Sequence, residues 1–292
     1  MNSPNNRWIL LNGSFHRERE YEARLPLGSR AVRYGDGCFE TWRSYRGEYL
    51  ELDLHMQRLQ RSIQYLRMDP PPILSDPEAV KAKSRKLLRK NRLADCDAVV
   101  RLQVWREGGR GFAVDRDAGT GYGITVSPLP KITEPVTLAT VGTRRIPSVS
   151  LDSRHKLSNS INYVLAAAEA AEQGADDALM LTVEGYLSET TIANIFWRKG
   201  ETVFTPSVSC DLLPGITRKL VIELLEQELK VPVQQGAWKQ EAIMECDAAW
   251  ICNSVREVVE VGVIDDKKIT GSGRFVKSLK HNFASMRDRR LQ

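Results

Sequence analysis

The sequence contains few cysteines, and their arrangement does not suggest a metal site. The five cysteines lie at positions 38, 96, 210, 246 and 252, with no C-x-x-C pair and no companion histidine cluster. This pattern argues against zinc and iron–sulfur sites. An odd number of cysteines in a chain without a signal peptide favours a reducing cytoplasm as the location.

Long apolar segments and a dinucleotide-binding glycine motif are also missing. Charges interrupt every apolar stretch well before the ~20 residues that a membrane span needs, so we expect no membrane segment. The glycine cluster GGRGF at 108–112 lacks the G-x-G-x-x-G spacing and the acidic residue that follows it in dinucleotide-binding folds. The sequence has no internal repeat and no low-complexity tract.

The overall composition is that of an ordinary globular protein. The chain has 292 residues, of which 42% are hydrophobic and 27% are charged, and its net charge is +5. This mild excess of positive charge can attract an anionic substrate but does not indicate nucleic-acid binding. The closing segment is basic, and we expect it to form a solvated helix face because Phe283 is its only aromatic residue among the charges. The basic residues concerned are Lys277, Lys280, Arg287, Arg289 and Arg290.

A proline-rich stretch divides the chain into two predicted domains. The prolines of PLPKITEP at 128–135 each remove a backbone donor and favour extended conformations in the preceding residue. We therefore predict a small N-terminal domain over 1–128, a linker over 129–135 and a larger C-terminal domain over 136–292.

Hydrophobic periodicity and turn signals predict a mixture of strands and helices in both domains. In the first domain, RWILLNGSFHR indicates a hairpin. Apolar and polar residues alternate over 33–50 around a glycine-rich bend. After it a helix is predicted, because apolar residues recur at helical spacing at Met56, Leu59, Ile63 and Leu66. A second helix is predicted over 76–91, with strands over 98–107 and 122–130.

In the second domain strands outnumber helices. Strands are predicted over 136–142, 177–183, 186–189, 194–197, 202–206, 248–254 and near 256–263, and helices over 161–174, 215–230 and the basic closing segment. This mixed order favours an α+β fold over a doubly wound parallel sheet.

Lys156, in the segment RHKLSNSINY, is a candidate nucleophile. Arg154 and His155 precede it, and small polar residues follow it. Cationic neighbours disfavour the ammonium form of a lysine, and burial acts in the same direction. An uncharged amine can form a Schiff base with a carbonyl cofactor. The alternative is a solvated loop lysine.

Two other charged residues suggest binding roles. Arg110, in the glycine-rich loop, suits capture of a carboxylate, although a plain surface loop is the alternative. Glu189 lies between two strand-like stretches, and a buried carboxylate there needs a cationic partner such as a protonated pyridine nitrogen. An exposed glutamate on an edge strand is the alternative.

A phosphate site is suggested by LLPGITRKL. Ile216 and Thr217 open a helix whose first amides, together with the threonine hydroxyl and the helix dipole, can bind an anion. Thr217 as an ordinary helix cap is the alternative. Ser254 can join the same anion from the end of a strand, or lie in a simple turn. Arg58 lies on the predicted helix that carries the apolar stripe of residues 56, 59, 63 and 66. It is a candidate binding residue, and the alternative is that it lies on the solvated face of that helix.

Six stretches, taken in chain order, resemble the class IV pyridoxal-phosphate enzymes of fold type IV. The matching stretches are YGDGCFET, HMQRLQRS, RHKLSNSINYVLAAAEAAEQGADDALML, GYLSETTIANIFWRKG, LLPGITR and ICNSVREVVEV. They extend over nearly the whole chain from residue 7 to the closing helix. The resemblance implies a small N-terminal α/β domain, a larger barrel-like α+β domain, a pyridoxal 5'-phosphate cofactor between them, and a homodimer.

The resemblance also implies a role for each candidate residue. Lys156 would hold the cofactor as a Schiff base and later carry the proton between substrate and cofactor. Glu189 would pair with the pyridine nitrogen. The phosphate would be held by Arg58, the Ile216 amide, Thr217 and Ser254, and the substrate by Arg33, Phe39, Thr41 and Arg110.

Two positions depart from the aminotransferases of the family. These enzymes often have a tyrosine four or five residues after the lysine, where this sequence has Ser160 and Ile161. Phe39 stands where D-amino-acid aminotransferases have a tyrosine whose hydroxyl helps to hold the substrate carboxylate.

The sequences of four stretches, GDGCFET, GGRGF, IFWRKG and CNSVRE, are more similar to the lyase branch of the family than to its aminotransferase branches. We therefore expect a 4-amino-4-deoxychorismate lyase, which releases pyruvate and forms 4-aminobenzoate. The alternative is a transaminase that acts on a D-amino acid or a branched-chain L-amino acid. In either case the expected partners are a small anionic amino substrate and a second copy of the chain, with no nucleic acid, membrane or metal.

Overall fold

The computed structural model describes residues 7–115 and 117–291, and the chain divides into two compact units. Residues 1–6 and 292, the outermost parts of the predicted domains, lie outside the described residues, as does residue 116. The first unit extends to Pro130 and also includes His155–Ser160; the second contains Lys131–Arg154 and the chain from Ile161 onward. Sequence reasoning had assigned the segment 155–160, which carries Lys156, to the C-terminal domain.

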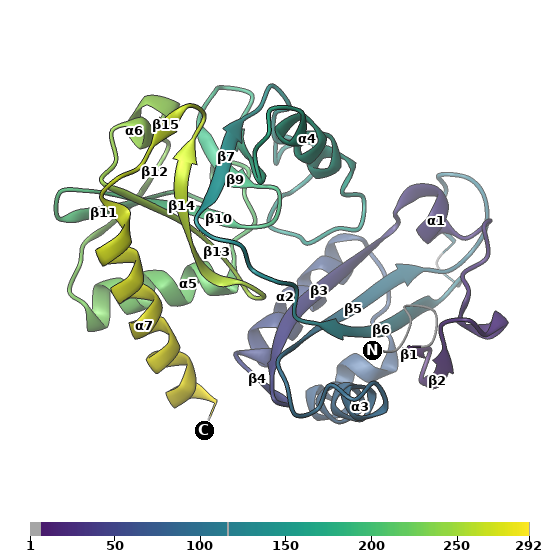
Figure 1. Cartoon of the computed structure of the whole chain (residues 1–292). Coiled ribbons are helices and arrows are strands. Elements are labelled where there is room, and N and C mark those ends of the chain that lie inside the picture. The colour runs from purple at the N-terminus through teal and green to yellow at the C-terminus, as the bar shows by residue number, and fades with distance from the viewer. Residues whose placement is uncertain (1–6, 116, 292) are drawn as a thin grey trace. The chain divides into compact units, whose positions relative to one another are not determined.

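Within the described residues, the first unit contains a six-stranded antiparallel sheet in the order β2-β1-β6-β5-β3-β4 (Figure 1). Helix α2 packs on β3, and α3 packs on β1 and β6. The elements are β1 (Trp8–Leu11), β2 (Ser14–Arg17), η2 (Tyr21–Ala23), α1 (Arg30–Tyr34), β3 (Gly37–Tyr45), β4 (Glu48–Tyr49), α2 (Leu52–Tyr65), η3 (Pro72–Ser75), α3 (Pro77–Lys90), β5 (Ala98–Arg106) and β6 (Thr120–Pro128).

The predicted hairpin, both long helices and strands β5 and β6 are confirmed. The stripe on α2 is buried at Met56, Leu59 and Ile63, and α3 begins where Asp76 caps it by accepting a hydrogen bond from the Glu78 amide. Every second residue of β5 from 98 to 104 is buried, as the strand period requires.

Strand β3 lies in the stretch 33–50, where the sequence analysis found alternation but predicted no strand bounds. Its buried face carries Cys38, Glu40, Trp42 and Ser44, so two of the four inward residues are polar. This composition weakens the apolar alternation by which the bounds of a strand are recognised.

The second unit has, among its described residues, a nine-stranded sheet that closes on itself. The path β12-β11-β10-β13-β14-β7-β8-β9 returns to β10 through the pair Asn194↔Glu189, which makes the sheet barrel-like. The elements are β7 (Val136–Thr140), α4 (Ile161–Glu172), β8 (Asp177–Leu181), β9 (Leu187–Thr190), β10 (Asn194–Lys199), β11 (Thr202–Pro206), α5 (Ile216–Glu223), the π-helical turn η4 (Leu224–Glu228), β12 (Val233–Gly236), α6 (Gln240–Met244), β13 (Ala248–Asn253), β14 (Glu257–Ile264), β15 (Lys267–Lys268) and α7 (Ser272–Arg290).

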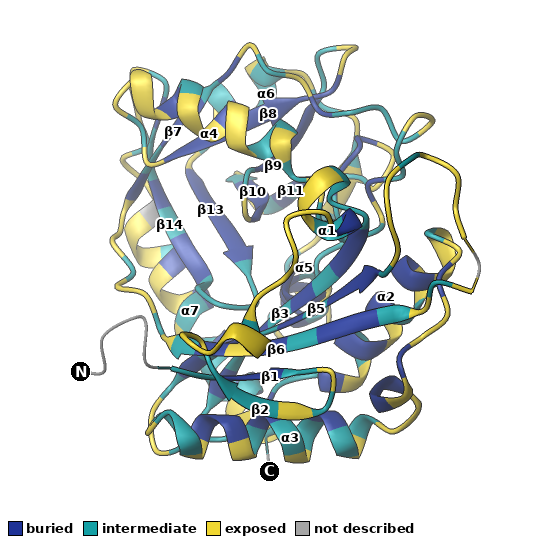
Figure 2. Cartoon of the chain, turned by 90° about the vertical axis from the view of Figure 1, so that its right-hand side faces the viewer, coloured by how far each residue is buried: buried dark blue, intermediate teal, exposed yellow. Residues whose placement is uncertain are grey.

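Three helices cover the barrel strands. Helix α4 packs on β7 and β8, α5 on β13, and α7 on β13 and β14. Figure 2 shows the contrast between the buried strands β13 and β14 and the exposed outer face of α4. The α+β class with a barrel-like second unit is therefore confirmed. The short elements α1, α6, β12 and β15 were not predicted, because at most one residue of each is buried and their sequences show no apolar pattern.

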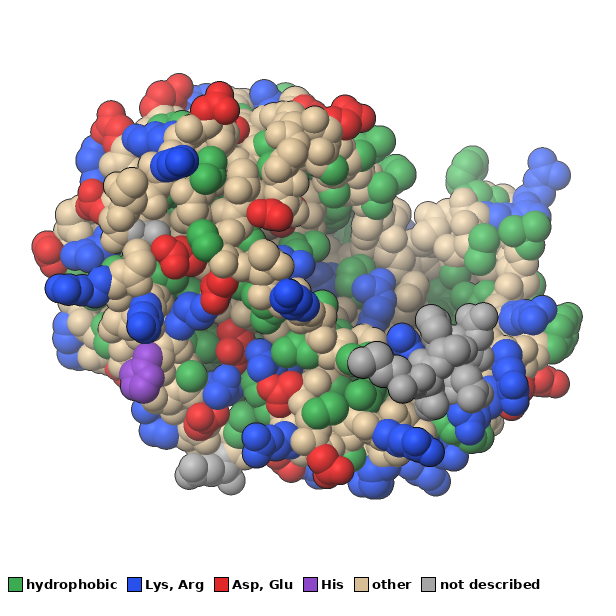
Figure 3. All heavy atoms as spheres, in the orientation of Figure 1, with side chains coloured by type: hydrophobic (Ala, Val, Ile, Leu, Met, Phe, Trp, Pro, Cys, Tyr) green, Lys and Arg blue, Asp and Glu red, His purple; other side chains and the backbone are tan. Residues whose placement is uncertain are grey.

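The basic closing helix is largely neutralised. Arg287 pairs with Glu257, Arg289 with Glu228, Arg290 with Glu223 and Lys280 with Glu134. Figure 3 shows basic and acidic side chains interleaved over the surface where α7 lies. A helix compensated in this way does not present the continuous positive stripe of a nucleic-acid site.

In the part of the chain that the structure describes, no helix has both the length and the apolar composition needed to cross a bilayer.

A charged cluster lies in the core of the first unit. Glu40 is fully buried and accepts hydrogen bonds from Arg58 Nε at 2.6 Å and Nη2 at 3.0 Å, and its Oε2 lies 2.7 Å from His55 Nδ1. Burial alone would raise the pKa of Glu40, but the Arg58 and His55 charges together hold it well below its ordinary value. Breaking a buried pair of this kind typically costs about 3–5 kcal/mol because it leaves one charge uncompensated.

His55 makes the stability of this cluster depend on pH. Burial lowers the pKa of His55, and the Glu40 charge offsets only part of that effect, with Arg58 and Lys156 opposing it. The unfolded chain therefore takes up a proton near the ordinary histidine value of about 6.5, where folded His55 does not. Stability is present above that pH and decreases as the pH falls through it.

We expect His55→Gln, which does not titrate but keeps an amide donor for Glu40, to lose less stability than the wild type between about pH 7.5 and about pH 5.5. Urea unfolding followed by tryptophan fluorescence measures the difference. His281→Gln, at an exposed position, is the control and should behave as the wild type. Equal losses in all three proteins would contradict the assignment.

Candidate active site

The segment 156–158 covers an open edge of the first sheet. β4 pairs with residues 44 and 45 of β3, and among the described residues no other strand pairs with β3 on that side. There the Phe39 amide donates to the Lys156 carbonyl at 3.0 Å, and the Ser158 amide donates to the Gly37 carbonyl at 2.9 Å. Backbone hydrogen bonds to a sheet edge therefore fix the position of Lys156.

Two further contacts tighten this arrangement. The Lys156 amide donates to Ser62 Oγ on α2 at 3.3 Å. Gly37 has no room for a side chain, because a Cβ there would lie 2.4 Å from the Val104 carbonyl oxygen of β5. Gly37, the second glycine of GDGCFET, is therefore required by the close approach of β3 to β5 at this position.

The Lys156 side chain and a second cation, Arg101, contact the same aromatic ring. Lys156 Nζ is 4.6 Å from the centre of the Phe39 ring, and the Arg101 guanidinium carbon is 3.6 Å from the same centre. Arg101 is half-buried, and burial lowers its pKa. No acidic group pairs with Arg101 among residues 7–115 and 117–291; its Nε donates only to Gln103 Oε1 at 3.5 Å. This arginine carries positive charge without a carboxylate partner in the described chain.

Strand register brings two of the predicted substrate residues to the same place. Phe39 and Thr41 are paired with Gln103 and Arg101 across β3 and β5, so these four side chains emerge on one face of the sheet, opposite the face that α2 and α3 cover.

Arg58 is buried within the first unit rather than on a solvated helix face. Its guanidinium is oriented by Glu40, so a buried acid sets the direction of the arginine predicted to bind phosphate. The sequence does not predict this pairing, since the alternation over 33–50 does not show that Glu40 faces α2.

Arg33 and Arg110 lie on two exposed segments that are joined to each other. Arg30 of α1 donates to the Gly111 carbonyl at 2.7 Å, and the Gly111 amide donates to the Tyr34 hydroxyl at 3.0 Å. The loop that carries Arg110 is therefore tied to the helix that carries Arg33.

Glu189 is buried in the second unit and surrounded by donors. The Tyr163 hydroxyl donates to Oε1 at 2.8 Å, and the Leu213 amide and Asn194 Nδ2 donate to Oε2 at 3.1 and 3.3 Å. Arg145 Nη2 lies 3.6 Å from Oε1. The alternative of an exposed glutamate is excluded, and the cation that a buried carboxylate requires is present within the unit.

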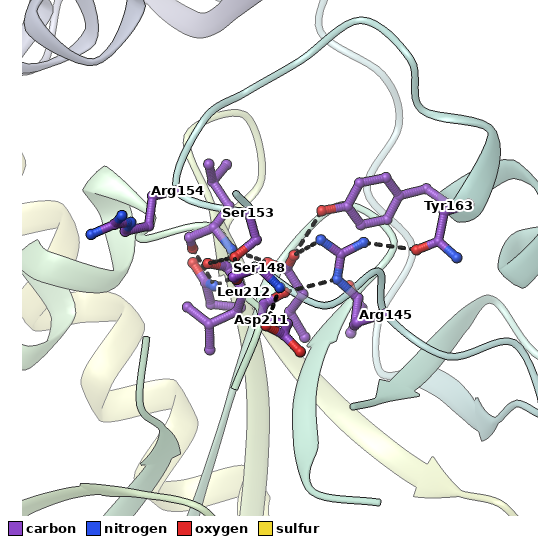
Figure 4. Close-up of polar contacts among 12 residues, drawn as sticks. Arg145, Ser148, Ser153, Arg154, Tyr163, Asp211 and Leu212 are labelled. Carbon is purple, nitrogen blue, oxygen red and sulfur yellow. Dashed lines mark hydrogen bonds and ion pairs between the residues drawn. The ribbon is translucent and has the colours of Figure 1, made fainter. Parts of the chain in front are cut away.

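Arg145 belongs to a network that joins two loops (Figure 4). Its Nε donates to the Asp211 carbonyl at 2.9 Å, the Ser148 amide donates to Asp211 Oδ1 at 2.8 Å, and Ser153 Oγ donates to the Leu212 carbonyl at 3.1 Å. The loop at 145–153 thereby fixes residues 211 and 212, next to the Leu213 amide that binds Glu189.

Three of the four residues predicted to bind phosphate, Ile216, Thr217 and Ser254, lie together at the start of α5. Thr217 Oγ1 and Ser254 Oγ lie 3.3 Å apart, and Gly215, the N-cap of α5, provides no side-chain cap. Thr217 is therefore not the helix cap, and Ile216 is the first residue of the helix. A Cβ at Gly215 would lie 2.2 Å from Asn194 Oδ1, so the glycine allows the helix start to approach the strand that carries Asn194. Free helix amides and two hydroxyls form a donor set suited to a phosphate.

Sequence reasoning missed four residues near these groups: Arg101, Arg145, Tyr163 and Asn194. Tyr163 follows Lys156 by seven positions rather than by four or five, and its hydroxyl contacts Glu189. The one available signal was the position of Asn194 five residues after Glu189, which suits a cross-strand pair at a tight connection.

The sequence and the fold are similar to those of known proteins. Residues 37–264 match the model of the amino-transferase class IV family. An aminodeoxychorismate lyase from Bacillus subtilis is 30% identical over 264 residues, covering 88% of this chain and 87% of its own. A Methanocaldococcus jannaschii protein, provisionally named a branched-chain-amino-acid aminotransferase, is 33% identical over 284 residues, covering 96% of each chain.

A solved structure shares the architecture. The branched-chain amino acid aminotransferase from Thermobaculum terrenum, in its pyridoxal-phosphate form, superposes with a TM-score of 0.87 at 25% identity, covering 99% of this chain and 96% of its own. With the family model spanning most of the sequence and relatives matched along nearly their whole length, this chain is a member of the class IV aminotransferase family.

Proposed function

We propose that the protein is a pyridoxal 5'-phosphate enzyme whose covalent residue is Lys156. The observation that carries this proposal is the attachment of the lysine backbone to the edge of β3, which holds one amine at a defined place beside the Phe39 ring. The donor set fits the cofactor: an amine for an aldehyde, a buried carboxylate for a ring nitrogen, and hydroxyls at a helix start for a phosphate.

When bound, the cofactor supplies an aldehyde that condenses with amines and a ring that accepts electrons from the substrate carbon. Lys156 Nζ would hold it covalently and would carry the proton at the substrate α-carbon. The Glu189 carboxylate would hold a proton on the ring nitrogen. Phosphate binding is assigned to Arg58, the Ile216 amide, Thr217 and Ser254.

The substrate is proposed to be anionic, and the strongest support is Arg101. A half-buried arginine without an acidic partner in the described chain, in contact with the same Phe39 ring as the Lys156 amine, is suited to bidentate binding of a carboxylate. Phe39 and Thr41 share its sheet face. Arg33 and Arg110, on their joined segments, are proposed to bind a second carboxylate.

The reaction that we favour is that of a 4-amino-4-deoxychorismate lyase, in which elimination releases pyruvate and leaves 4-aminobenzoate. It is supported by the sequences of the motifs and by the similarity to the Bacillus subtilis aminodeoxychorismate lyase. The second candidate is a transaminase acting on a D-amino acid or a branched-chain L-amino acid, and the Methanocaldococcus jannaschii relative favours it.

We also propose a homodimer located in the cytoplasm. All five cysteines are free thiols, and α4 exposes Ile161, Val164 and Leu165, apolar side chains that a second copy could cover. A monomer mass in sedimentation equilibrium would contradict the dimer.

The two reactions are separated by their products. We expect the cofactor-loaded protein to release equal amounts of pyruvate and 4-aminobenzoate from 4-amino-4-deoxychorismate, as measured by a lactate dehydrogenase coupled assay and by chromatography. With D-alanine or L-leucine and 2-oxoglutarate we expect glutamate to form far more slowly. Rapid glutamate formation without release of 4-aminobenzoate would refute the lyase and support the transaminase.

Arg101→Met should weaken substrate binding without loss of the cofactor. Removal of a charge-assisted contact worth about 3 kcal/mol lowers kcat/KM by about 100-fold. The matched control is Arg43→Met, because Arg43 lies on the same sheet face but pairs with Asp97. The proposal fails if both variants keep wild-type kcat/KM, or if Arg101→Met loses the cofactor instead.

A further inference from the structure

Arg145 is held in place independently of Glu189. Its Nε donates to the Asp211 carbonyl and its Nη1 donates to Asn162 Oδ1, both at 2.9 Å, and its backbone amide donates to the Leu181 carbonyl at 2.9 Å. The guanidinium carbon lies 4.2 Å from the centre of the Tyr163 ring. The position of this cation is therefore set by the surrounding loops rather than by the carboxylate.

The contact between Arg145 and Glu189 differs in kind from the others at this carboxylate. At 3.6 Å it is longer than a hydrogen bond, whereas Tyr163, which stacks on Arg145, donates to the same oxygen at 2.8 Å. Arg145 thus supplies charge and Tyr163 supplies direction. Burial and the Glu189 charge raise the pKa of Tyr163 well above its ordinary value, so its hydroxyl stays protonated as a donor.

Charge at this position decides where a shared proton lies. A buried carboxylate without a nearby cation tends to take up a proton and become neutral. A carboxylate beside a fixed cation remains ionised and leaves the proton on its partner. The charge of Arg218 also reaches Glu189, but the Arg218 guanidinium donates to the Pro206 carbonyl and to Gln235.

We infer that Arg145 is a positioning residue that keeps Glu189 in its carboxylate form, so that the proton shared with the cofactor ring stays on the ring nitrogen. The inference rests on the proposed function for the identity of the ring. The role of Arg145 toward Glu189 concerns this chain alone, and no contact between Arg145 and the cofactor is involved.

Infrared spectroscopy of the protein, with and without added pyridoxal phosphate, tests the inference. The carboxylic-acid band of Glu189 is identified by its loss in Glu189→Gln. In Arg145→Met without cofactor we expect the band to appear at a pH at least one unit higher than in the wild type, which corresponds to about a tenfold gain in proton affinity. The dissociation constant of the cofactor should rise by about tenfold.

Three further variants make the result specific. Arg145→Lys, which keeps the charge, should restore the wild-type midpoint, and Arg144→Met, which removes the neighbouring exposed arginine, should not change it. Tyr163→Phe removes only a hydroxyl and should give a smaller upward shift, which serves as the test if Arg145→Met does not fold.

Wild-type midpoints in Arg145→Met, or in Tyr163→Phe where Arg145→Met does not fold, would overturn the inference. So would a shift that Arg145→Lys does not reverse, since the shape of the side chain and not its charge would then be responsible. Failure of the wild type to bind pyridoxal phosphate would instead refute the proposed function, and the infrared midpoints without cofactor would still decide the role of Arg145.

Discussion

The position of Lys156 depends on a pair of backbone hydrogen bonds at the edge of β3. A sheet edge exposes donors and acceptors that must be satisfied, and residues 156–158 satisfy them where β4 does not reach. The same contacts give Lys156 a fixed origin and leave its side chain beside the Phe39 ring. A loop lysine without this attachment would not hold its amine at a single reactive position, because side-chain entropy would oppose it.

Charge compensation follows a common plan in both units. In the first, Glu40 is neutralised by Arg58 and contacts His55; in the second, Glu189 lies near Arg145 and accepts a hydrogen bond from Tyr163. Each buried acid therefore has a cation beside it before any ligand is present, and in the second unit Asp211 and Asn162 also hold that cation. Arg101 differs, because it has no acidic partner in the described chain. An arginine of this kind can give an anionic substrate a strong charge-assisted hydrogen bond.

Hydrophobic periodicity in the sequence predicted the helices and strands that have a clear period, and the motifs predicted the candidate site residues. The α2 stripe, the hairpin at Asn12–Gly13 and most barrel strands follow from spacing alone, and the burial of Glu189 and the open start of α5 at Gly215 agree with the chemistry inferred there. The alternation over 33–50 did not predict the bounds of β3, because Glu40 and Ser44 interrupt its apolar face.

What could not be predicted are the partners that only the fold brings together. Arg101 meets Thr41 through strand register, and Arg145 meets Glu189 through a loop that no period describes. The attachment of Lys156 to the first unit was hidden for the same reason, since its sequence neighbours belong to the second. The order of the motifs was enough to identify the family. The charged partners of the site residues could be identified only from the structure.

The most direct test of the central claim is to reduce the cofactor-loaded protein with borohydride and to locate the modified residue by peptide mass spectrometry. We expect one phosphopyridoxyl group per chain, on Lys156, and none in Lys156→Ala. A modification on a different lysine, or a Lys156→Ala protein that is still labelled to the same extent, would contradict the account.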